Sequence, residues 1–510
     1  MTAADYRESL RAYRPRVFVN GAAVDSVADE PLLAPGVNAV GITYDFAHKA
    51  EHRQLMTARQ GTSGKTVNRM LHIDETSADL LHKLEAVRLV CKVSGCAQRY
   101  LTHDAFNGIF QATKRADDAN GTDRHQRFLA YMHGVQDADL TLGVAMTDAK
   151  GDRSKRPGAQ ANPDVYVHIA QRRPDGIVIR GIKAIVTGAP YMHEFLVMPC
   201  RTMTAEDADF AVCCAVPVDA PGVTIVARPA GRPGEAAASF SGRYGQSTGV
   251  VVFDDVFVPW DRVFLDGQHE EAGFLTTSYA THHRHSCIGA RAGFGDLLIG
   301  AGALMIEANG LDPDRHAHVR DAMVELITIT EGFFACGVAA SVYATGDPAG
   351  NVMPDAVFSN IGKLLLATRI YDMHRLAHYV SGGLIVALPG PDEDHNPETQ
   401  ASLSAVLAGR PDIPAAQRME VARFIEDLTV SHQGAWYSVI SLHGGGSPEA
   451  MKREIWRNYP VMEKVELVES LLDRGVADEG RRVSKQPGRC CPTGCEVPAP
   501  FGEGVGEGVP

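Results

Sequence analysis

Three histidines and one cysteine lie close together in the segment Thr281-His-His-Arg-His-Ser-Cys287. An imidazole titrates near neutral pH, and a thiolate is a nucleophile and a metal ligand. The spacing therefore suggests acid–base or metal chemistry. The same residue types are also typical of a helix start that needs polar capping, so this segment alone leaves both interpretations open.

Three other segments could contact a bound cofactor. Met146–Ser154 gathers hydroxyl, glycine and basic residues, which suit a phosphate or a ring edge, although a solvated turn has the same composition. A strand ending in Thr187-Gly188 presents a hydroxyl and open backbone, unless Pro190 only stops the pairing. Three glycines at Gly444–Gly446 allow close backbone approach to a ligand, or form a hinge.

Hydrophobic periodicity predicts the elements that position these segments. Apolar residues recur at helical steps from a cap at Thr76 or Ser77 onward, with a polar loop at Asp117–Asp123. Short β-branched runs then predict strands, with a hairpin turn at Asp175-Gly176. The predicted strands are Ile177–Val186, Phe195–Met198, Phe210–Val218, Val223–Ala227 and Val250–Val258.

The helical period returns after Phe274 and continues to about Leu472. The predicted helices are Leu297–Ala308, Ala317–Tyr343, Ala356–Val380, Ala415–Ser431 and Ala450–Leu472, with a loop at Pro389–Glu398. We therefore predict an α+β fold in four parts: a mainly helical unit (1–145), a β domain (146–275), a helix bundle (276–476) and an extended tail (477–510).

Composition excludes several classes of function. The 510 residues are 45% hydrophobic and 22% charged, and the net charge is −13 with no long Lys/Arg run, which argues against nucleic acid as a partner. The longest nearly uncharged stretch, Gly332–Gly346, is too short to cross a bilayer, and Met1–Val19 lacks the apolar run of a signal peptide. We expect a cytoplasmic protein without a membrane segment.

The cysteines predict neither a disulfide scaffold nor a metal site. Ten cysteines in 510 residues are too sparse for a stapled fold. Cys490, Cys491 and Cys495 crowd the tail but lack a nearby fourth ligand for a tetrahedral metal. No Gly-x-Gly-x-x-Gly motif follows a predicted strand, so we expect no site for NAD(P)H in this chain.

Together the segments resemble the flavin-dependent 4-hydroxyphenylacetate 3-hydroxylase family, which includes 4-hydroxybutyryl-CoA dehydratase. The resemblance runs from Arg14 to Ser470 and is densest at Val251–Trp260, at His283-Arg284 and at Gly295-Asp296. It implies an acyl-CoA dehydrogenase-like fold, a homotetramer and bound FAD. The residues that it places along FAD are Lys150, Gly151, Asp152, Arg153, Arg156, Pro157, Gly158, Ala159, Thr187, Gly444, Gly445 and Gly446.

The dehydratase branch of the family combines FAD with an iron–sulfur cluster held by a Cys-x3-Cys pair and a His-x6-Cys pair. The matching positions here are Cys96 with Tyr100, and His283 with Ala290. A phenol and a methyl group do not replace thiolates on cluster iron. The dehydratase's catalytic Tyr falls at Cys287 and its Glu at Ile440, which moves no proton. The resemblance therefore implies a dehydratase-like lineage without its cluster.

The hydroxylase branch holds its phenolic substrate with an Arg-x3-Tyr pair and a His near the flavin loop. This chain keeps Tyr100 but has Cys96 in place of the Arg, and Val144 or Gly143 in place of the His. We therefore expect Cys96, Tyr100 and Val144 to line the substrate site. A hydroxyphenylacetate-specific site does not follow from these residues.

From this resemblance we expect the oxygenase component of a two-component monooxygenase. A separate NAD(P)H-dependent reductase would supply reduced FAD, and the substrate would be a small aromatic or related molecule. The expected catalytic residues are His283 as acid or base, Tyr100 as orienting hydroxyl and Cys287, with His282 and His285 turned away. Two alternatives stay open: acyl-CoA chemistry with FAD but without iron, and a non-catalytic flavin-binding protein.

Overall fold

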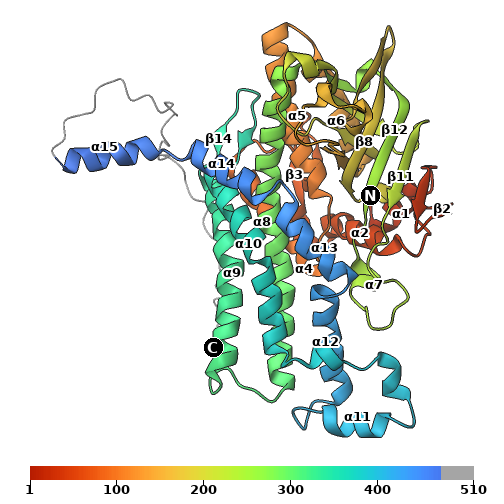
Figure 1. Ribbon diagram of the computed structural model, residues 1–510, viewed down its shortest axis with the longest axis vertical. Coiled ribbons are helices and arrows are strands. Elements are labelled where there is room, and N and C mark those ends of the chain that lie inside the picture. The colour runs from red at the N-terminus through yellow and green to blue at the C-terminus, as the bar shows by residue number, and fades with distance from the viewer. Residues whose placement is uncertain (473–510) are drawn as a thin grey trace, which may run out of the picture.

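The computed structural model describes residues 1–472, so the predicted tail and its three cysteines lie outside the described residues. Helices and strands build three layers, with a β domain packed beside a long helix bundle (Figure 1). The first layer is helical. Its members are α1 (Ala3–Leu10), α2 (Ala34–His48), α3 (Ala50–Met56), α4 (Ser77–Ser94), α5 (Tyr100–Asn120) and α6 (Arg124–Ala138).

Two sheets form the β domain. The seven-stranded sheet has the order β2-β1-β11-β12-β8-β6, with β7 also paired to β8, and the four-stranded sheet has the order β13-β10-β9-β5. Their strands are β1 (Val17–Val19), β2 (Ala22–Val24), β5 (Leu142–Ala145), β6 (Thr147–Asp148), β7 (His168–Arg173), β8 (Gly176–Thr187), β9 (Glu194–Val197), β10 (Val212–Pro217), β11 (Val223–Ala227), β12 (Thr248–Pro259) and β13 (Val263–Asp266).

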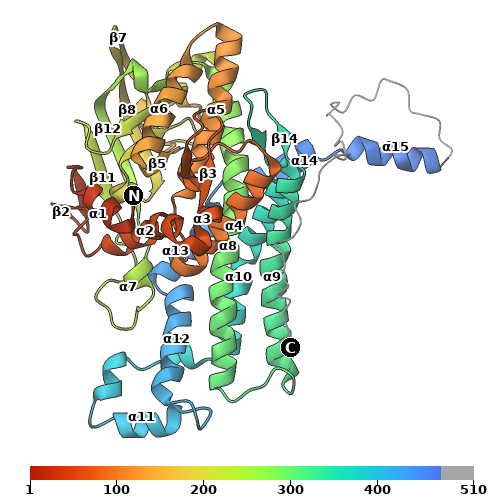
Figure 2. The ribbon, with the colours of Figure 1, turned by 180° about the vertical axis from the view of Figure 1, so that it is seen from behind.

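The C-terminal part of the chain is helical, with α8, α9 and α10 side by side in a long bundle and α15 projecting away from it (Figures 1 and 2). Its members are α8 (His269–Ala308), α9 (Ala317–Val342), α10 (Ala356–Val380), α11 (Gln400–Leu407), α12 (Ala415–Thr429), α13 (His432–His443), α14 (Pro448–Asn458) and α15 (Val461–Leu471). Short pieces complete the chain: α7 (Ser241–Tyr244), and the two-stranded pairs β3 (Thr57–Arg59) with β4 (Thr66–Asn68) and β14 (Thr345–Gly346) with β15 (Val352–Met353).

The predicted elements are largely present. Thr76 caps α4 through a reciprocal capping box with Asp79, and Asp175-Gly176 turns the chain between β7 and β8. The boundaries between the parts shift by a few residues, because β5 already belongs to the β domain and α8 begins at His269. The N-terminal part also supplies β1 and β2 to the larger sheet, and the predicted helix Ala450–Leu472 is two helices.

The most important correction concerns the histidine-rich segment. We expected Thr281–Asp296 at the entrance of a helix, but it lies in the middle of the 40-residue helix α8. Polar capping therefore does not explain its side chains.

Two glycines bring α8 against α4. A Cβ atom at Gly289 would lie 2.6 Å from the Leu84 carbonyl oxygen, and one at Gly293 would lie 2.6 Å from the Arg88 carbonyl oxygen. Both distances are too short for any other residue, so these glycines let the two backbones touch. The close approach places the loop after α4 and the start of α5 beside the histidine-rich stretch of α8.

Two helices, α8 and α9, are long and apolar enough to cross a membrane by length and composition alone, contrary to the expectation from uncharged runs. The apolar window of α8 is 61% buried inside the protein, which is typical of a core helix. The window of α9 is 33% buried, and its outer face exposes Val324 and Ile327.

Candidate active site

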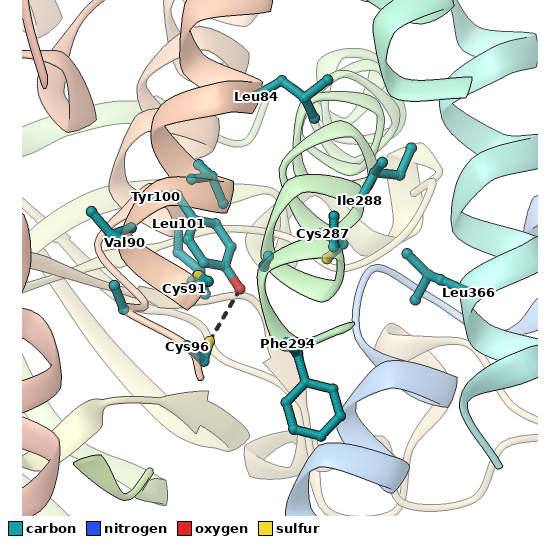
Figure 3. Close-up of a cluster of buried hydrophobic side chains, with 14 of the residues drawn as sticks. Leu84, Val90, Cys91, Cys96, Tyr100, Leu101, Cys287, Ile288, Phe294 and Leu366 are labelled. Carbon is teal, nitrogen blue, oxygen red and sulfur yellow. Dashed lines mark hydrogen bonds between the residues drawn. The ribbon is translucent and has the colours of Figure 1, made fainter. Parts of the chain in front are cut away.

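A narrow pocket with a cavity volume of about 30 Å³ lies where α5, α8, α10, α13 and the end of β8 meet. Its lining mixes thiols, aromatic rings and cations. The lining residues are Cys96, Tyr100, Leu101, Thr187, His283, Cys287, Ala290, Arg291, Lys363, Leu366, Trp436, Ile440, Ser441 and Gly444. Figure 3 shows Cys96 and Tyr100 on one wall of this region, with Cys287 on α8 and Leu366 on α10 across from them.

The four positions compared with the cluster ligands of the dehydratase branch all line this one pocket: Cys96, Tyr100, His283 and Ala290. The Cys96 Sγ and the Tyr100 Oη lie 3.4 Å apart, the contact drawn as a dashed line in Figure 3. Within residues 1–472, no group of three or more His, Cys, Asp or Glu side chains could hold a metal ion.

His283 lies between a thiol and a carboxylate. Its Nδ1 is 3.0 Å from the Asp104 Oδ2, and its Nε2 is 3.5 Å from the Cys287 Sγ. Because a carboxylate only accepts, Nδ1 carries a proton and donates it to Asp104, which leaves Nε2 facing Cys287. The ring is also stacked between Tyr100 and Tyr279, with centroid distances of 6.1 and 5.3 Å. His283 is therefore held in one tautomer and one orientation.

Asp104 is fully buried but does not lack partners. Lys83 lies 3.6 Å away, Ser286 donates a 2.6 Å hydrogen bond, and the His103 Nδ1 is 3.6 Å distant. Burial by itself raises the pKa of Asp104, but Lys83 and the bonds from His103 and His283 outweigh it and hold this pKa well below its usual range. Asp104 is therefore a permanent carboxylate.

Asp104 influences the pKa of the Cys287 thiol indirectly, through His283. Burial lowers the pKa of His283, but the Cys287 thiolate and the hydrogen bond to Asp104 prevail and raise it above its usual value. Burial likewise raises the pKa of Cys287, but the His283 imidazolium prevails and lowers it. The pair therefore favours thiolate and imidazolium, the arrangement of an activated cysteine.

A second thiol in the pocket is also acidified. A hydrogen bond from Cys91 is the largest influence on Cys96, and Arg291 and Tyr100 add to it, so that its pKa falls to about 6. Cys91 is buried, and burial is the main reason why its own pKa rises. Of the two thiols, Cys96 is therefore the one that ionises near neutral pH.

The other two histidines of the segment do not line the pocket. His285 contacts α9 instead, where its Nε2 lies 2.8 Å from the Ser341 Oγ and 3.1 Å from the Gly337 carbonyl oxygen. His282 is fully buried, and burial lowers its pKa to about 3. Successive helix side chains diverge by about 100°, so only His283 faces the pocket.

The glycine turn after α13 lies directly on the histidine-rich stretch. Arg284 donates a 2.8 Å hydrogen bond to the Gly445 carbonyl oxygen, and a Cβ atom at Gly445 would lie 3.4 Å from the His283 Cδ2. Gly445 and Gly446 have φ of +74° and +102°, which favour glycine. Gly444 lines the pocket opposite Thr187, so two of the predicted cofactor segments meet there.

The loop at 150–159, predicted to lie along FAD, does not line the pocket. It leaves the sheet after β6, where Asp148 pairs with Lys183 on β8, the strand that ends at Thr187. Arg156 is engaged by Asp207, with its Nε 2.8 Å from the Asp207 Oδ2, and the Gly158 amide donates to the same carboxylate. The side chains of residues 151–155 are exposed.

Val144 was expected at the substrate site but does not line the pocket. It lies on β5 opposite Leu196 of β9 and is buried in the core. The expected place of Val144 at the substrate site is therefore not supported, whereas Cys96 and Tyr100 do line the pocket.

Several functional candidates escaped the sequence interpretation. Asp104 lies four residues after Tyr100 in a segment with an ordinary helical pattern. Only its position on the same face of α5 as Tyr100 could have indicated that it belongs to the site. Arg291 follows Ala290 directly, whereas Lys363, Trp436 and Ser441 come from helices distant in sequence, so no local spacing predicts them.

Comparisons with known proteins place this architecture in a family. The 4-hydroxyphenylacetate 3-hydroxylase N-terminal and C-terminal family models match residues 2–265 and 272–473. The 4-hydroxybutyryl-CoA dehydratase/vinylacetyl-CoA-Delta-isomerase of Clostridium aminobutyricum is 35% identical, covering 92% of this chain and 99% of that protein. The 4-hydroxyphenylacetate 3-monooxygenase oxygenase component of Thermus thermophilus is 26% identical, covering 91% and 96%.

Solved structures agree with this placement. An oxygen-tolerant archaeal 4-hydroxybutyryl-CoA dehydratase from N. maritimus superimposes with a TM-score of 0.90 at 33% identity, covering 96% of this chain and 97% of that one. An oxygenase component of 4-hydroxyphenylacetate 3-monooxygenase complexed with FAD superimposes with a TM-score of 0.83 at 23% identity, covering 92% and 98%. The chain therefore belongs to the 4-hydroxyphenylacetate 3-hydroxylase family of flavoproteins and has its acyl-CoA dehydrogenase-like fold.

Proposed function

We propose that this protein is an FAD-dependent enzyme that works without an iron–sulfur cluster, as the oxygenase component of a two-component monooxygenase. The observation that carries the absence of a cluster is the convergence of Cys96, Tyr100, His283 and Ala290 on one pocket. Only two of these four side chains are of a type that ligates cluster iron. The pocket is enclosed by buried side chains, which suits chemistry that water must not reach.

The residues present suit the ring end of FAD. Thr187 and Gly444 offer a hydroxyl and a side-chain-free edge at the pocket. The loop at 150–159 follows β6, which pairs with β8, the strand that ends at Thr187. When bound, reduced FAD supplies the electrons that activate dioxygen.

The chain's own residues would then act on the substrate. His283, held by Asp104, moves a proton at its Nε2, and Tyr100 orients the substrate through its hydroxyl. Leu101, Leu366 and Trp436 supply the apolar surface that a small aromatic ring needs. The thiol of Cys287 shares the His283 proton and so sets the charge state of the acid–base pair.

Acyl-CoA chemistry with FAD alone is the second candidate, because 35% identity to the dehydratase exceeds the 26% identity to the oxygenase component. Two acidified thiols beside the reacting centre also suit redox-neutral chemistry better than chemistry with activated oxygen, which oxidises thiolates. In this reading His283 moves a proton on the carbon chain of an acyl thioester.

One experiment separates the two candidates. The FAD-loaded protein is given reduced FAD and isotopically labelled dioxygen with a panel of phenols, and separately vinylacetyl-CoA without oxygen. Label in a hydroxylated phenol supports the monooxygenase, and formation of the conjugated isomer supports acyl-CoA chemistry. Absence of both activities in protein that retains FAD would refute both.

The proposal extends to partners. An NAD(P)H-dependent flavin reductase would deliver reduced FAD in the cytoplasm, and small molecules would be the substrates.

We also propose a homotetramer, because apolar side chains on the outer faces of α9 and α10 are exposed: Val324, Ile327, Leu365, Tyr371 and Tyr379. Light scattering during size-exclusion chromatography tests this, and a monomer would refute it.

A further inference from the structure

Positive charge is concentrated in the pocket. Arg291 and Lys363 line it together with His283, and the part of the chain that the structure describes contributes no Asp or Glu side chain to the lining. The nearest carboxylate of the acid–base pair, Asp104, lies behind His283 and is fully buried. Even with both thiols ionised, three cations face two thiolates. The pocket therefore carries a surplus positive charge in a desolvated place.

Arg291 is the clearer of the two fixed cations. It is 4% exposed, its Nε donates a 2.6 Å hydrogen bond to the Ser441 Oγ, and its NH1 has no hydrogen-bond partner among residues 1–472. The guanidinium carbon also lies 5.5 Å from the centroid of the Tyr437 ring, so the group is fixed in place. A buried donor without an acceptor is costly, and a bound anion would satisfy it.

Lys363 approaches from a different helix, α10. It is 1% exposed, and its Nζ donates a 2.5 Å hydrogen bond to the Ser441 carbonyl oxygen. Ser441 thus links both cations, one through its hydroxyl and one through its carbonyl. Burial, with Arg291 and Arg284 nearby, lowers the pKa of Lys363 to about 8 in spite of Cys287. A bound substrate anion would stabilise the charged form of Lys363, as the Cys287 thiolate does.

We infer that Arg291 and Lys363 form an oxyanion-binding subsite for the substrate, which takes either the phenolate of an aromatic or the enolate of an acyl thioester. The inference rests on the proposed function only in placing the substrate in this pocket. Both ligands share one chemistry, a delocalised oxygen anion on a planar carbon framework, which a guanidinium and an ammonium recognise by charge-assisted hydrogen bonds.

The test uses the FAD-loaded protein and two coloured anions. 4-Nitrophenol reports its own ionisation by visible absorbance, and acetoacetyl-CoA reports its enolate in the ultraviolet. We expect one of the two to bind as the anion at a pH where the free ligand is mostly protonated. Arg291→Met and Lys363→Met should each weaken that binding about tenfold to hundredfold, the range for hydrogen bonds to a charged group.

Conservative and distant variants keep the result interpretable. Arg291→Lys and Lys363→Arg retain the charge and should retain most of the binding. Arg423→Met removes an arginine that is also buried, at 7% exposure, but that bonds the Pro389 carbonyl oxygen and does not line the pocket. It should cost stability and leave anion binding unchanged. Binding of the anion should also fall as pH rises through about 8, where Lys363 loses its proton. The other titratable and charged groups near Lys363 are His283, Cys287, Cys96, Arg291 and Arg284.

Three outcomes would overturn the subsite. Either wild-type protein binds neither anion, or the FAD-loaded Met variants bind the anion as tightly as wild type. If the Met variants lose FAD affinity alone, the cations serve the cofactor and the inference is wrong. If the anion binds as expected but the protein neither hydroxylates phenols nor isomerises vinylacetyl-CoA, the subsite stands and the proposed function fails.

Discussion

The Asp104 Oδ2 lies 3.0 Å from the His283 Nδ1, on the side of the imidazole that faces away from Cys287. Asp104 comes from α5 and His283 from the middle of α8, 179 residues apart in sequence. The bond fixes which ring nitrogen faces the pocket and keeps the imidazole charged. The acid–base pair therefore depends on the contact between α5 and α8, where a Cβ atom at Gly108 of α5 would lie 3.1 Å from the Tyr279 backbone nitrogen.

Asp104→Asn tests this dependence. The amide preserves the shape but removes the charge that holds His283 as an imidazolium, so we expect turnover to fall about tenfold to hundredfold, the usual cost of losing an orienting partner. The pKa of His283 should fall, which a pH profile of turnover would show as an acidic shift. Asp104→Glu should recover part of the activity. An unchanged pH profile in a folded Asp104→Asn protein would show that the bond has no role.

His283→Ala should lower turnover by about 10²–10⁴-fold with FAD still bound, the usual contribution of a positioned acid–base group. His282→Ala and His285→Ala should leave the chemical step near wild type, because neither side chain lines the pocket. His285→Ala should instead lower the melting temperature, since it loses bonds to Ser341 and Gly337. Single-turnover kinetics with reduced FAD compares the three variants, and full activity of His283→Ala would exclude it as the acid–base residue.

Alkylation by iodoacetamide tests the charge state of Cys287. The lowered pKa of this thiol predicts that it reacts at pH values below about 8.5, where an ordinary thiol is mostly protonated. Asp104→Asn should raise that pKa again and slow the reaction at pH 6 to 7. Mass spectrometry assigns the modified residue, and Cys213, whose pKa burial raises, is the internal control. An ordinary thiol profile at Cys287 would contradict the ion pair.

Two substitutions test the cofactor position. Thr187→Val and Arg153→Ala should each weaken FAD binding by about 1–3 kcal/mol, the range for a lost hydrogen bond or charged contact. Thr187 would act at the ring end, and Arg153 at the far end of the loop that leaves the sheet after β6. Fluorescence titration with FAD measures both. Unchanged affinity in the two variants would place the cofactor elsewhere.

Local pattern was enough to predict most of the fold. β11 runs from Val223 to Ala227 and α10 from Ala356 to Val380, as their periodicity predicts, because each buries one regular face. The histidine-rich segment was misplaced because α8 is buried around most of its circumference in this stretch. A helix without a polar face leaves no periodic signal in the sequence.

The sequence predicted only those site residues that lie near one another in the chain. His283 and Cys287 are four residues apart in one segment, so their residue types and spacing drew attention to them. Cys96 and Tyr100 were predicted from the family resemblance instead, and their side chains lie 3.4 Å apart. Lys363 and Ser441 meet Arg291 only through packing of α10 and α13 against α8. Contacts of that kind depend on tertiary structure, which residue spacing does not encode.

The cofactor content of the purified protein tests the central claim most directly. Protein isolated without oxygen is analysed for flavin by absorbance, and for iron and acid-labile sulfide by elemental and colorimetric assay. With a phenol at Tyr100 and a methyl group at Ala290 in the pocket, we predict about one FAD per chain, as for a flavin-dependent enzyme, and no stoichiometric iron. About four irons per chain with matching sulfide, the content of a complete cluster, would contradict the account.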